Sequence, residues 1–270
     1  MRSRPVTQSG RMEQHSPSIR AHAVALMRQG IPNRIVAERL NVPRGTVGWW
    51  RSEDRRARGE AYEQPTDCPH CTGREFDHAA YAYLLGLYLG DGHIISKRKQ
   101  HHLSVFCNAM QTGLITAAEE AMRKVMPLPS VKQRYKPGCV EVKSYTKHWT
   151  CMFPQHGPGK KHERPIVLEA WQQEIVDAHP WEFIRGLIHS DGCRITNWTT
   201  RLVGGERKRY EYPRYFFTNV SDDIRQLYTD TLDQLGIQWT HCTRNGNPYN
   251  ISVARKASVA LMDAHVGPKY

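Results

Sequence analysis

The sequence lacks any apolar run that approaches the roughly 20 residues of a membrane-spanning helix. Residues 1–10 carry charge but no apolar core like that of a secretory signal. Cysteine is sparse too: the seven cysteines are odd in number and mostly scattered, which is typical of reduced thiols. These absences exclude a membrane protein and a secreted disulfide scaffold. We therefore expect a soluble protein of a reducing, intracellular compartment.

Acidic residues are few relative to basic ones. The chain has 38 Lys and Arg against 26 Asp and Glu, a net charge of +12, and a pI of about 9.5. Residues 1–60 hold twelve arginines, no lysine and five acids, a net charge of +7. Solubility alone does not require this excess, which predicts attraction to the phosphates of a nucleic acid.

One nine-residue motif occurs twice. Leu84–Gly92 reads LLGLYLGDG and Ile184–Gly192 reads IRGLIHSDG, so each copy ends an apolar helical run with Asp-Gly. The two aspartates, Asp91 and Asp191, are 100 residues apart, which leaves room for a small α/β unit after each copy. A single Asp-Gly is typical of a helix-ending turn. Two copies in equivalent contexts instead predict a duplicated acidic site.

The segments after each motif follow the same order, αββαββα. The first copy is followed by a strand-like run over 103–107 and a helical run over 114–125. After the second come a strand-like run over 215–220 and a helix over 221–235, which begins at Ser221-Asp222-Asp223 and stops at Gly236. The order indicates an α+β protein with two similar halves.

The two motifs, the αββαββα repeats and the phrase Asn219–Asp223 resemble the LAGLIDADG homing endonuclease family over about residues 77–268. The resemblance implies two motif helices that pack through small residues, bind divalent metal with their closing acids, and lie between two saddle-shaped sheets in the DNA major groove. The predicted domains are a helix-turn-helix domain (1–60), a linker (61–76), the first repeat (77–156), a connection (157–179) and the second repeat (180–270). The implied helix contacts pair Gly86 with Gly186 and Gly90 with Ser190.

Asp91 and Asp191 are the predicted metal ligands and catalytic residues. Two carboxylates that converge on one point repel each other unless a cation lies between them, and Mg²⁺ prefers such hard oxygen ligands. The sixth motif position, often acidic in the family, is Leu89 in one copy and His189 in the other. That position usually lies outside the metal site, so its loss does not exclude cleavage.

The family commonly places a lysine near the bound phosphate. The candidates are Lys143, Lys147 and Lys256, and aligning Phe153 with Met262 pairs Lys147 with Lys256. We therefore predict Lys147 and Lys256 as catalytic. Both fall just after the expected strand position, and a lysine at a strand edge is more often solubilising or in contact with phosphate.

The front of the chain resembles a helix-turn-helix. Helical runs over 18–29 and 33–40 precede the turn Asn41-Val42-Pro43 and a basic third helix that begins at Arg44. A bare helical hairpin is the alternative. We expect Arg44, Thr46, Arg51 and Arg55 to face the DNA groove or its phosphates. The predicted core is Ala25, Ile35, Ala37, Leu40, Val42, Val47 and Trp50.

The linker carries Cys68-Pro69-His70-Cys71, which looks like half of a zinc ribbon. The sequence has no second Cys-x-x-Cys, and His70 or His78 completes only part of a site. Zn²⁺ at Cys68 and Cys71 is thus one reading, and a tight turn with two ordinary thiols is the other.

Between the repeats, residues 155–165 combine glycine and proline with a cluster of cations. Lys160 and Lys161 in this segment are predicted to contact the DNA backbone. A solvated linker is the alternative.

Two function classes follow from these features. The first is a Mg²⁺-dependent, site-specific double-strand DNA endonuclease, and the second is a DNA-binding transcriptional regulator that kept the fold and lost cleavage. Both retained acids favour the nuclease, whereas the unmatched lysine and the helix-turn-helix favour the regulator. Because both repeats lie in one chain, we expect a monomer, located in bacterial or phage-infected cytoplasm at the nucleoid.

Overall fold

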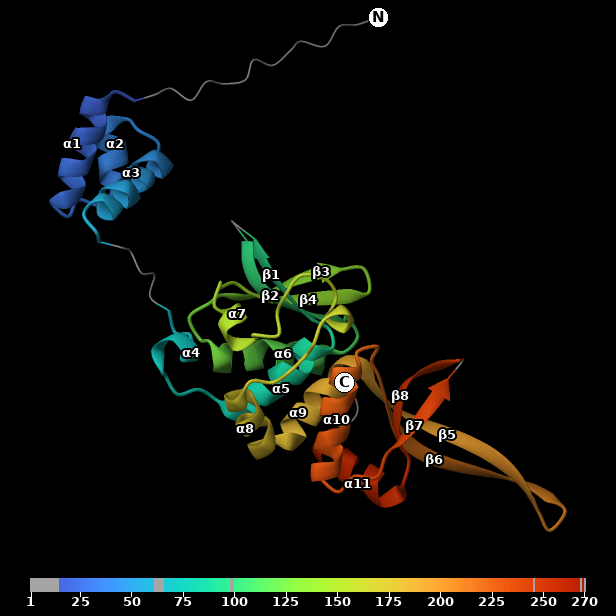
Figure 1. Ribbon diagram of the computed structural model, residues 1–270. Helices are drawn as coiled ribbons and strands as arrows, with labels where there is room; N and C mark the ends of the chain where they lie inside the picture. Colours follow the sequence, from blue (N-terminus) through green and yellow to red (C-terminus); the bar gives the residue numbers. More distant parts are fainter. Residues whose placement is uncertain (1–14, 61–65, 98–99, 245, 268, 270) are drawn as a thin grey trace, which may run out of the picture. The chain divides into compact units, whose positions relative to one another are not determined.

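The chain forms two compact units, Met1–Pro65 and Thr66–Tyr270. The computed structural model describes residues 15–60, 66–97, 100–244, 246–267 and 269 (Figure 1). None of the helices in these ranges is long and apolar enough to cross a membrane.

The first unit is a three-helix bundle of α1 (Pro17–Arg28), α2 (Asn33–Leu40) and α3 (Arg44–Ala57). Asn41 adopts the left-handed conformation (φ 50°) that ends α2 and starts the turn into α3. The expected helix boundaries are therefore nearly those observed. The predicted core was wrong at Ala25, which is exposed. Ile35 and Leu40 are only partly buried, because the buried faces of α1 and α2 centre on neighbouring positions. The buried apolar side chains are Ala23, Met27, Val36, Ala37, Val42, Val47 and Trp50.

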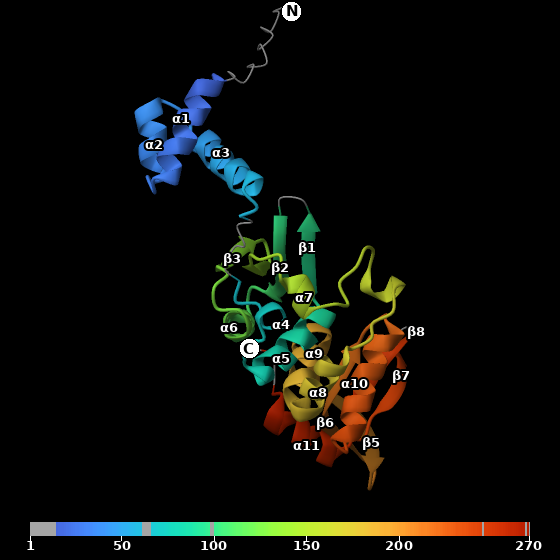
Figure 2. The same cartoon turned by 60° about the vertical axis from the view of Figure 1, so that its left-hand side comes forward.

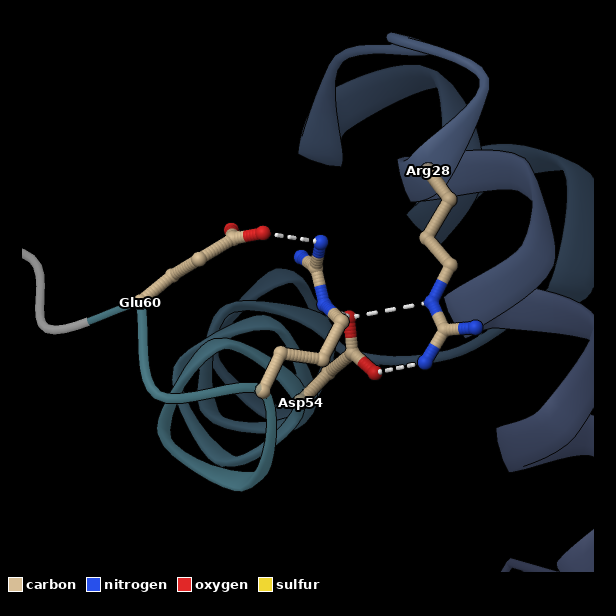
Figure 3. Close-up of polar contacts among 4 residues, drawn as sticks. Arg28, Asp54 and Glu60 are labelled. Atoms are coloured by element: carbon tan, nitrogen blue, oxygen red, sulfur yellow. Dashed lines mark hydrogen bonds and ion pairs between the residues drawn. The ribbon is translucent and has the colours of Figure 1, made fainter.

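An ion pair joins the first and third helices of this unit. Arg28 at the end of α1 donates two hydrogen bonds to the Asp54 carboxylate in α3, at 2.6 and 3.3 Å (Figure 3). Arg28 is the last residue of α1, and Asp54 lies in the second half of α3, far from the turn that precedes this helix. It fixes the long α3 against α1 by a bidentate contact.

The second unit contains the two predicted repeats, each with the order αββαββα. The first repeat comprises α5 (His78–Leu89), β1 (Gly92–Lys97), β2 (Gln100–Asn108), α6 (Thr112–Val125), β3 (Val131–Lys136), β4 (Cys139–Ser144) and α7 (Trp149–Met152). The second comprises α9 (Pro180–Asp191), β5 (Gly192–Val203), β6 (Glu206–Thr218), α10 (Asp222–Gln234), β7 (Thr240–Arg244), β8 (Asn247–Val253) and α11 (Lys256–His265). A short helix, α4 (Pro69–Thr72), precedes the repeats, and a 3₁₀ turn (Lys161–Glu163) and α8 (Ala170–Ala178) connect them.

Each repeat builds a four-stranded antiparallel sheet of the same topology. The strand orders are β1-β2-β4-β3 and β5-β6-β8-β7, and each motif helix leads directly into an edge strand. The two motif helices, α5 and α9, lie side by side between the sheets (Figures 1 and 2). The hairpin of β5 and β6 is much longer than that of β1 and β2 and extends past β7 and β8 (Figure 1).

The core is continuous through both repeats. All nine residues from Tyr81 to Leu89 of α5 are buried, as expected of a helix that is apolar on every side. Gln172 of α8 is also buried and donates to the Tyr81 hydroxyl at 2.6 Å, so the connecting segment is fastened to the first motif helix. The two repeats therefore form one packed body around α5 and α9.

Candidate metal centre and nucleic-acid interface

The two motif helices approach each other closely because each presents a glycine to the other. A Cβ built on Gly86 would lie 2.6 Å from the carbonyl oxygen of Phe183, and one on Gly186 would lie 2.2 Å from that of Tyr83. In both cases the added Cβ would clash with a backbone atom, which cannot move away by rotating as a side chain can. The structure thus brings together Gly86 and Gly186, the first of the two predicted interface pairs.

The second predicted pair, Gly90 and Ser190, lies at the ends of the same helices. A Cβ on Gly90 would meet the Ser190 hydroxyl oxygen at 2.1 Å and an Asp191 carboxylate oxygen at 3.1 Å. The Ser190 hydroxyl donates to the carbonyl of Leu187 at 2.9 Å and also lies 3.4 Å from the carbonyl of Gly86 on the opposite helix. The absence of a side chain at Gly90 therefore leaves room for the Ser190 side chain and, next to it, for the Asp191 carboxylate.

Asp91 and Asp191 both lie at this junction, near enough for the charge of Asp91 to act on the pKa of Asp191. Burial and the charge of Asp91 raise the pKa of Asp191 to about 6. Burial also raises the pKa of Asp91, although the charges of Lys269 and Lys161 oppose this shift. Asp91 is accessible to solvent, yet the surrounding protein removes enough water to disfavour its charged form. The two carboxylates thus resist simultaneous ionisation.

Two lysines reach the junction from the segments that follow each repeat. The Lys161 amine donates to the carbonyls of Tyr88, Gly90 and Gly92, at 2.5, 2.5 and 3.0 Å. The Lys269 amine donates to the carbonyl of Ser190 at 2.7 Å. Each lysine therefore caps the carbonyl end of one motif helix, where the helix dipole favours a cation. Burial lowers the pKa of Lys161 to about 8, against the opposing effect of both aspartates, and lowers the pKa of Lys269 as well.

The two halves of the acidic site differ in how the carboxylate is held. The Asn219 amide donates to the Asp191 carboxylate at 2.6 Å from the end of β6. By strand register, Gly192 pairs with Phe217 and Gly92 with Val105, so Asn219 corresponds to Cys107. The nearby charge of Asp91, added to burial, raises the pKa of the Cys107 thiol. Asp191 is therefore held by an amide, whereas a thiol occupies the equivalent position in the half that contains Asp91.

A cleft of about 490 Å³ opens beside the acidic junction. Asp191 and Asn219 line it on one side, and His93, His156 and Arg164 line it on the other. Burial lowers the pKa of His93 and of His156, so both imidazoles tend to be neutral. The cleft thus joins the Asp191 carboxylate, neutral imidazoles and cations in one space.

The sheet faces that point away from the helices are polar and basic. In the first sheet, Lys143 and Lys136 each lie 3.1 Å from the buried Glu141 carboxylate, and Arg134 on the same face is largely exposed. In the second sheet, Arg214 lies over the rings of Tyr212 and Phe216. Beyond them, the projecting end of the β5–β6 hairpin carries four exposed cations: Arg201, Arg207, Lys208 and Arg209.

The predicted catalytic lysines lie elsewhere. Lys147 lies in the turn before α7, next to His148, and Lys256 is the first residue of α11; both are exposed. The cations that act on the pKa of Asp91 are instead Lys269 and Lys161. Sequence reasoning placed Lys161 on a phosphate-binding loop and missed Lys269, because only the folded chain brings their segments back to the motif helices.

The predicted DNA-contacting residues of the first unit lie on α3. Arg44 is exposed at its first turn, and Thr46 and Arg55 are partly buried. Arg51 donates to the Asn33 side chain at 2.9 Å, which ties α3 to α2. In the connection, Lys160 is exposed and lies 3.6 Å from Glu163. Cys68 immediately precedes α4 of the second unit, and Cys71 lies within that helix.

The altered sixth motif position is buried in both copies. His189 packs its ring edge-on against Tyr83 and shares a hydrogen bond of 3.1 Å with the Tyr83 hydroxyl. Burial lowers the pKa of His189 to about 4. Leu89 is fully buried in the core. His189 therefore contributes to the contact between the motif helices, and Leu89 to the core.

The two αββαββα repeats that meet along two motif helices confirm the architecture that the two motifs predicted. No protein-family model matches the chain, and no curated protein matches it. Similar solved structures include the homing endonuclease I-DmoI in complex with DNA and Ca, which is 14% identical with a TM-score of 0.48 and covers 71% of this chain and 91% of that one. The homing endonuclease I-WcaI bound to its DNA recognition sequence is 11% identical with a TM-score of 0.45, covering 72% and 82%. The N-terminal LAGLIDADG domain of DUF199/WhiA is 10% identical with a TM-score of 0.43, covering 72% and 83%. At these identities the likeness concerns the fold alone.

Proposed function

We propose that the protein is a monomeric, Mg²⁺-dependent, site-specific DNA endonuclease that hydrolyses phosphodiester bonds. The observation that carries this proposal is the convergence of Asp91 and Asp191, one from each repeat, on one junction between two basic sheets. A DNA-binding protein with no chemistry to perform has no need for two mutually repelling carboxylates at the centre of its binding surface.

The residues at the junction fit a divalent metal. Asp91 and Asp191 supply hard oxygen ligands. Burial and the charge of Asp91 raise the pKa of Asp191 to about 6, and a cation would offset both effects. Because Gly90 has no side chain, the Ser190 hydroxyl and the Asp191 carboxylate can both approach the end of the first motif helix. When bound there, Mg²⁺ would supply Lewis-acid stabilisation of the phosphate and an activated water.

Lys161 and Lys269 support the proposal as fixed positive charges. With a pKa of about 8, Lys161 remains mostly protonated at neutral pH. Its amine is held by three backbone carbonyls, so it costs little reorganisation when negative charge develops on a phosphate nearby. We assign Lys161 and Lys269, in place of Lys147 and Lys256, the role of stabilising the scissile phosphate.

The outer sheet faces and the first unit supply the DNA contacts in this proposal. Cations such as Arg134 and Arg214 neutralise phosphates and set the register, and the side chains between them read base edges. The projecting β5–β6 hairpin is a two-stranded ribbon, and the DNA major groove is wide enough to admit such a ribbon. The first unit, through Arg44 and Thr46 of α3, lengthens the recognised site.

One observation favours a second candidate, a regulator that binds DNA without cleaving it. Two lysine charges face two carboxylate charges at the junction, so the site approaches neutrality without a metal. In a regulator this arrangement would serve only to hold the motif helices together.

The two candidates are separated by one experiment on the full chain. Wild type and the variant Asp91→Asn/Asp191→Asn are incubated with a randomised double-stranded DNA library and Mg²⁺. The nuclease proposal predicts that wild type cuts DNA sequences that share a motif. The variant should bind the same sequences without cutting them, with an affinity within a few-fold of that of wild type. Enrichment without cutting in wild type would overturn the nuclease in favour of the regulator. A failure to select any sequence would overturn both.

A further inference from the structure

Two short helices, α4 before the first repeat and α7 at its end, carry matching pairs of soft metal ligands. Cys68 precedes α4 and Cys71 lies within it; His148 precedes α7 and Cys151 lies within it. Each pair is three residues apart and spans the first turn of its helix, with Cys71 N–H bonded to the Cys68 carbonyl at 3.1 Å and Cys151 N–H to that of His148 at 3.0 Å. The chain folds 77 residues back to bring Cys71 against His148.

The four ligand atoms lie within 4.8 Å of one another. With Zn–S bonds of about 2.3 Å and Zn–N bonds of about 2.0–2.1 Å, a tetrahedral zinc site has S···S edges of about 3.8 Å and S···N edges of about 3.5 Å. The Cys71 and Cys151 sulfurs are 3.7 Å apart. The His148 Nδ1 atom lies 3.4 Å from the Cys71 sulfur and 3.8 Å from the Cys151 sulfur. The three distances match the edges of such a tetrahedron, and all are far longer than a disulfide bond of about 2.05 Å.

We propose a structural zinc site with four protein ligands: Cys68, Cys71, His148 and Cys151. Three thiolates and one imidazole are a soft ligand set that favours Zn²⁺ over Mg²⁺. Because the protein fills all four tetrahedral positions, the site keeps no open position for a substrate or water. The bound zinc therefore stabilises the fold and does not take part in the reaction at Asp91 and Asp191.

The surroundings of the cluster suit a bound metal. Cys68 is fully buried in the core, so its thiolate would be costly without a cation. Three thiolates and Zn²⁺ carry one net negative charge, and Lys147, the residue before His148, places a cation next to it. This assigns the exposed Lys147 a place beside the zinc site.

The site fastens the start of the second unit to the first repeat. Other contacts hold the same segment more weakly: the Leu128 N–H donates to Asp67 at 2.6 Å, and Arg74 donates to the Val125 carbonyl at 2.9 Å. Zinc adds a cross-link between α4 and α7 that closes nearly the whole first repeat into a loop, which stabilises it by reducing the freedom of the unfolded chain. The residues that follow the first unit are thereby anchored.

Zinc content of the full chain, purified without chelator, tests the proposal. We expect about one zinc per chain in wild type, and well below half an equivalent in Cys151→Ser and in His148→Ala. The variant His148→Cys offers another thiolate in the same place and should retain zinc, which separates loss of a ligand from loss of folding. Cys139→Ser removes a cysteine of the same repeat outside the cluster and should keep a full equivalent.

Two further readouts do not depend on variants or on DNA cleavage. Replacement of zinc by Co²⁺ in wild type should give the visible absorption of a tetrahedral thiolate complex. Chelation should increase hydrogen exchange over residues 66–74 while leaving α5 protected. Substoichiometric zinc in wild type, with Cys71 and Cys151 freely alkylated under native conditions, would overturn the site. So would a full equivalent of zinc in both Cys151→Ser and His148→Ala.

Discussion

Replacing Gly86 by alanine tests the close approach of the motif helices that positions the two acids. The added Cβ would lie 2.6 Å from the Phe183 carbonyl oxygen and 2.7 Å from the Leu187 nitrogen. Ordinary contacts of this kind are about 3.4 Å, so α5 and α9 must separate by the better part of an ångström. Overpacking against a rigid backbone costs about 3 kcal/mol, and the better helix propensity of alanine returns about 1 kcal/mol. We expect a net destabilisation of about 2 kcal/mol.

Native-state hydrogen exchange of the full chain measures this effect segment by segment. For Gly86→Ala, a loss of about 2 kcal/mol corresponds to exchange about 30-fold faster in α5 and α9, with α3 of the first unit unchanged. The control is Gly45→Ala in α3, where the added Cβ meets nothing within 4 Å. It should slow exchange in α3 by the helix-propensity gain and leave α5 untouched. If Gly86→Ala left α5 as protected as in wild type, the inferred contact between the helices would be refuted.

Three more predictions concern the lysine, the first unit and the buried histidine. Lys161→Met should lower the cleavage rate about 10²–10³-fold at nearly unchanged DNA affinity. The control variant Lys160→Met changes the exposed neighbouring lysine and should weaken only DNA binding. Equal cleavage rates in the two variants would show that Lys161 is not part of the site. Deleting residues 1–60 should reduce the slope of log K against log salt by about 0.9 for each lost phosphate contact, and an unchanged slope in a folded truncation would exclude the first unit from the interface. His189, whose pKa falls from 6.5 to about 4 on folding, contributes stability that is complete above pH 6.5 and is lost as the pH falls through 4. The advantage of wild type over His189→Gln in urea unfolding should therefore shrink by up to about 3 kcal/mol between pH 7.5 and pH 4, and a constant difference would contradict the shifted pKa.

The repeated architecture could be predicted because short-range sequence patterns determine its helices and turns. The first motif helix is a strongly apolar run. Helix α10 of the second repeat is capped by Ser221, which accepts from the Ile224 N–H, and ends before Gly236 (φ 67°). The left-handed Gly236 and the capping serine are signals that act within one turn of the chain. The same applies to the helices of the first unit and to Asn41 between them.

The remaining features depend on contacts between distant segments. Lys161 and Lys269 reach the acids only after the connection and the end of the chain fold back on the motif helices, and their local sequences resemble solvated loops. His148 and Cys151 escaped notice because they are far from Cys68 in sequence, although their spacing of three residues repeats that of Cys68 and Cys71. The outer half of the β5–β6 hairpin was missed because it is exposed on both faces and so lacks the apolar alternation that identifies a half-buried strand.

The central claim, that the two repeats share one metal site, is tested most directly by Mn²⁺ binding to the zinc-loaded full chain. Binding isotherms of wild type, Asp91→Asn, Asp191→Asn and the double variant form a double-mutant cycle, with Glu174→Gln on the surface of α8 as control. If both carboxylates hold the same metal, either single substitution should weaken binding at least about tenfold, and the double variant should lose little more. Two separate sites, each removed by one substitution while the other keeps its affinity, would contradict the account.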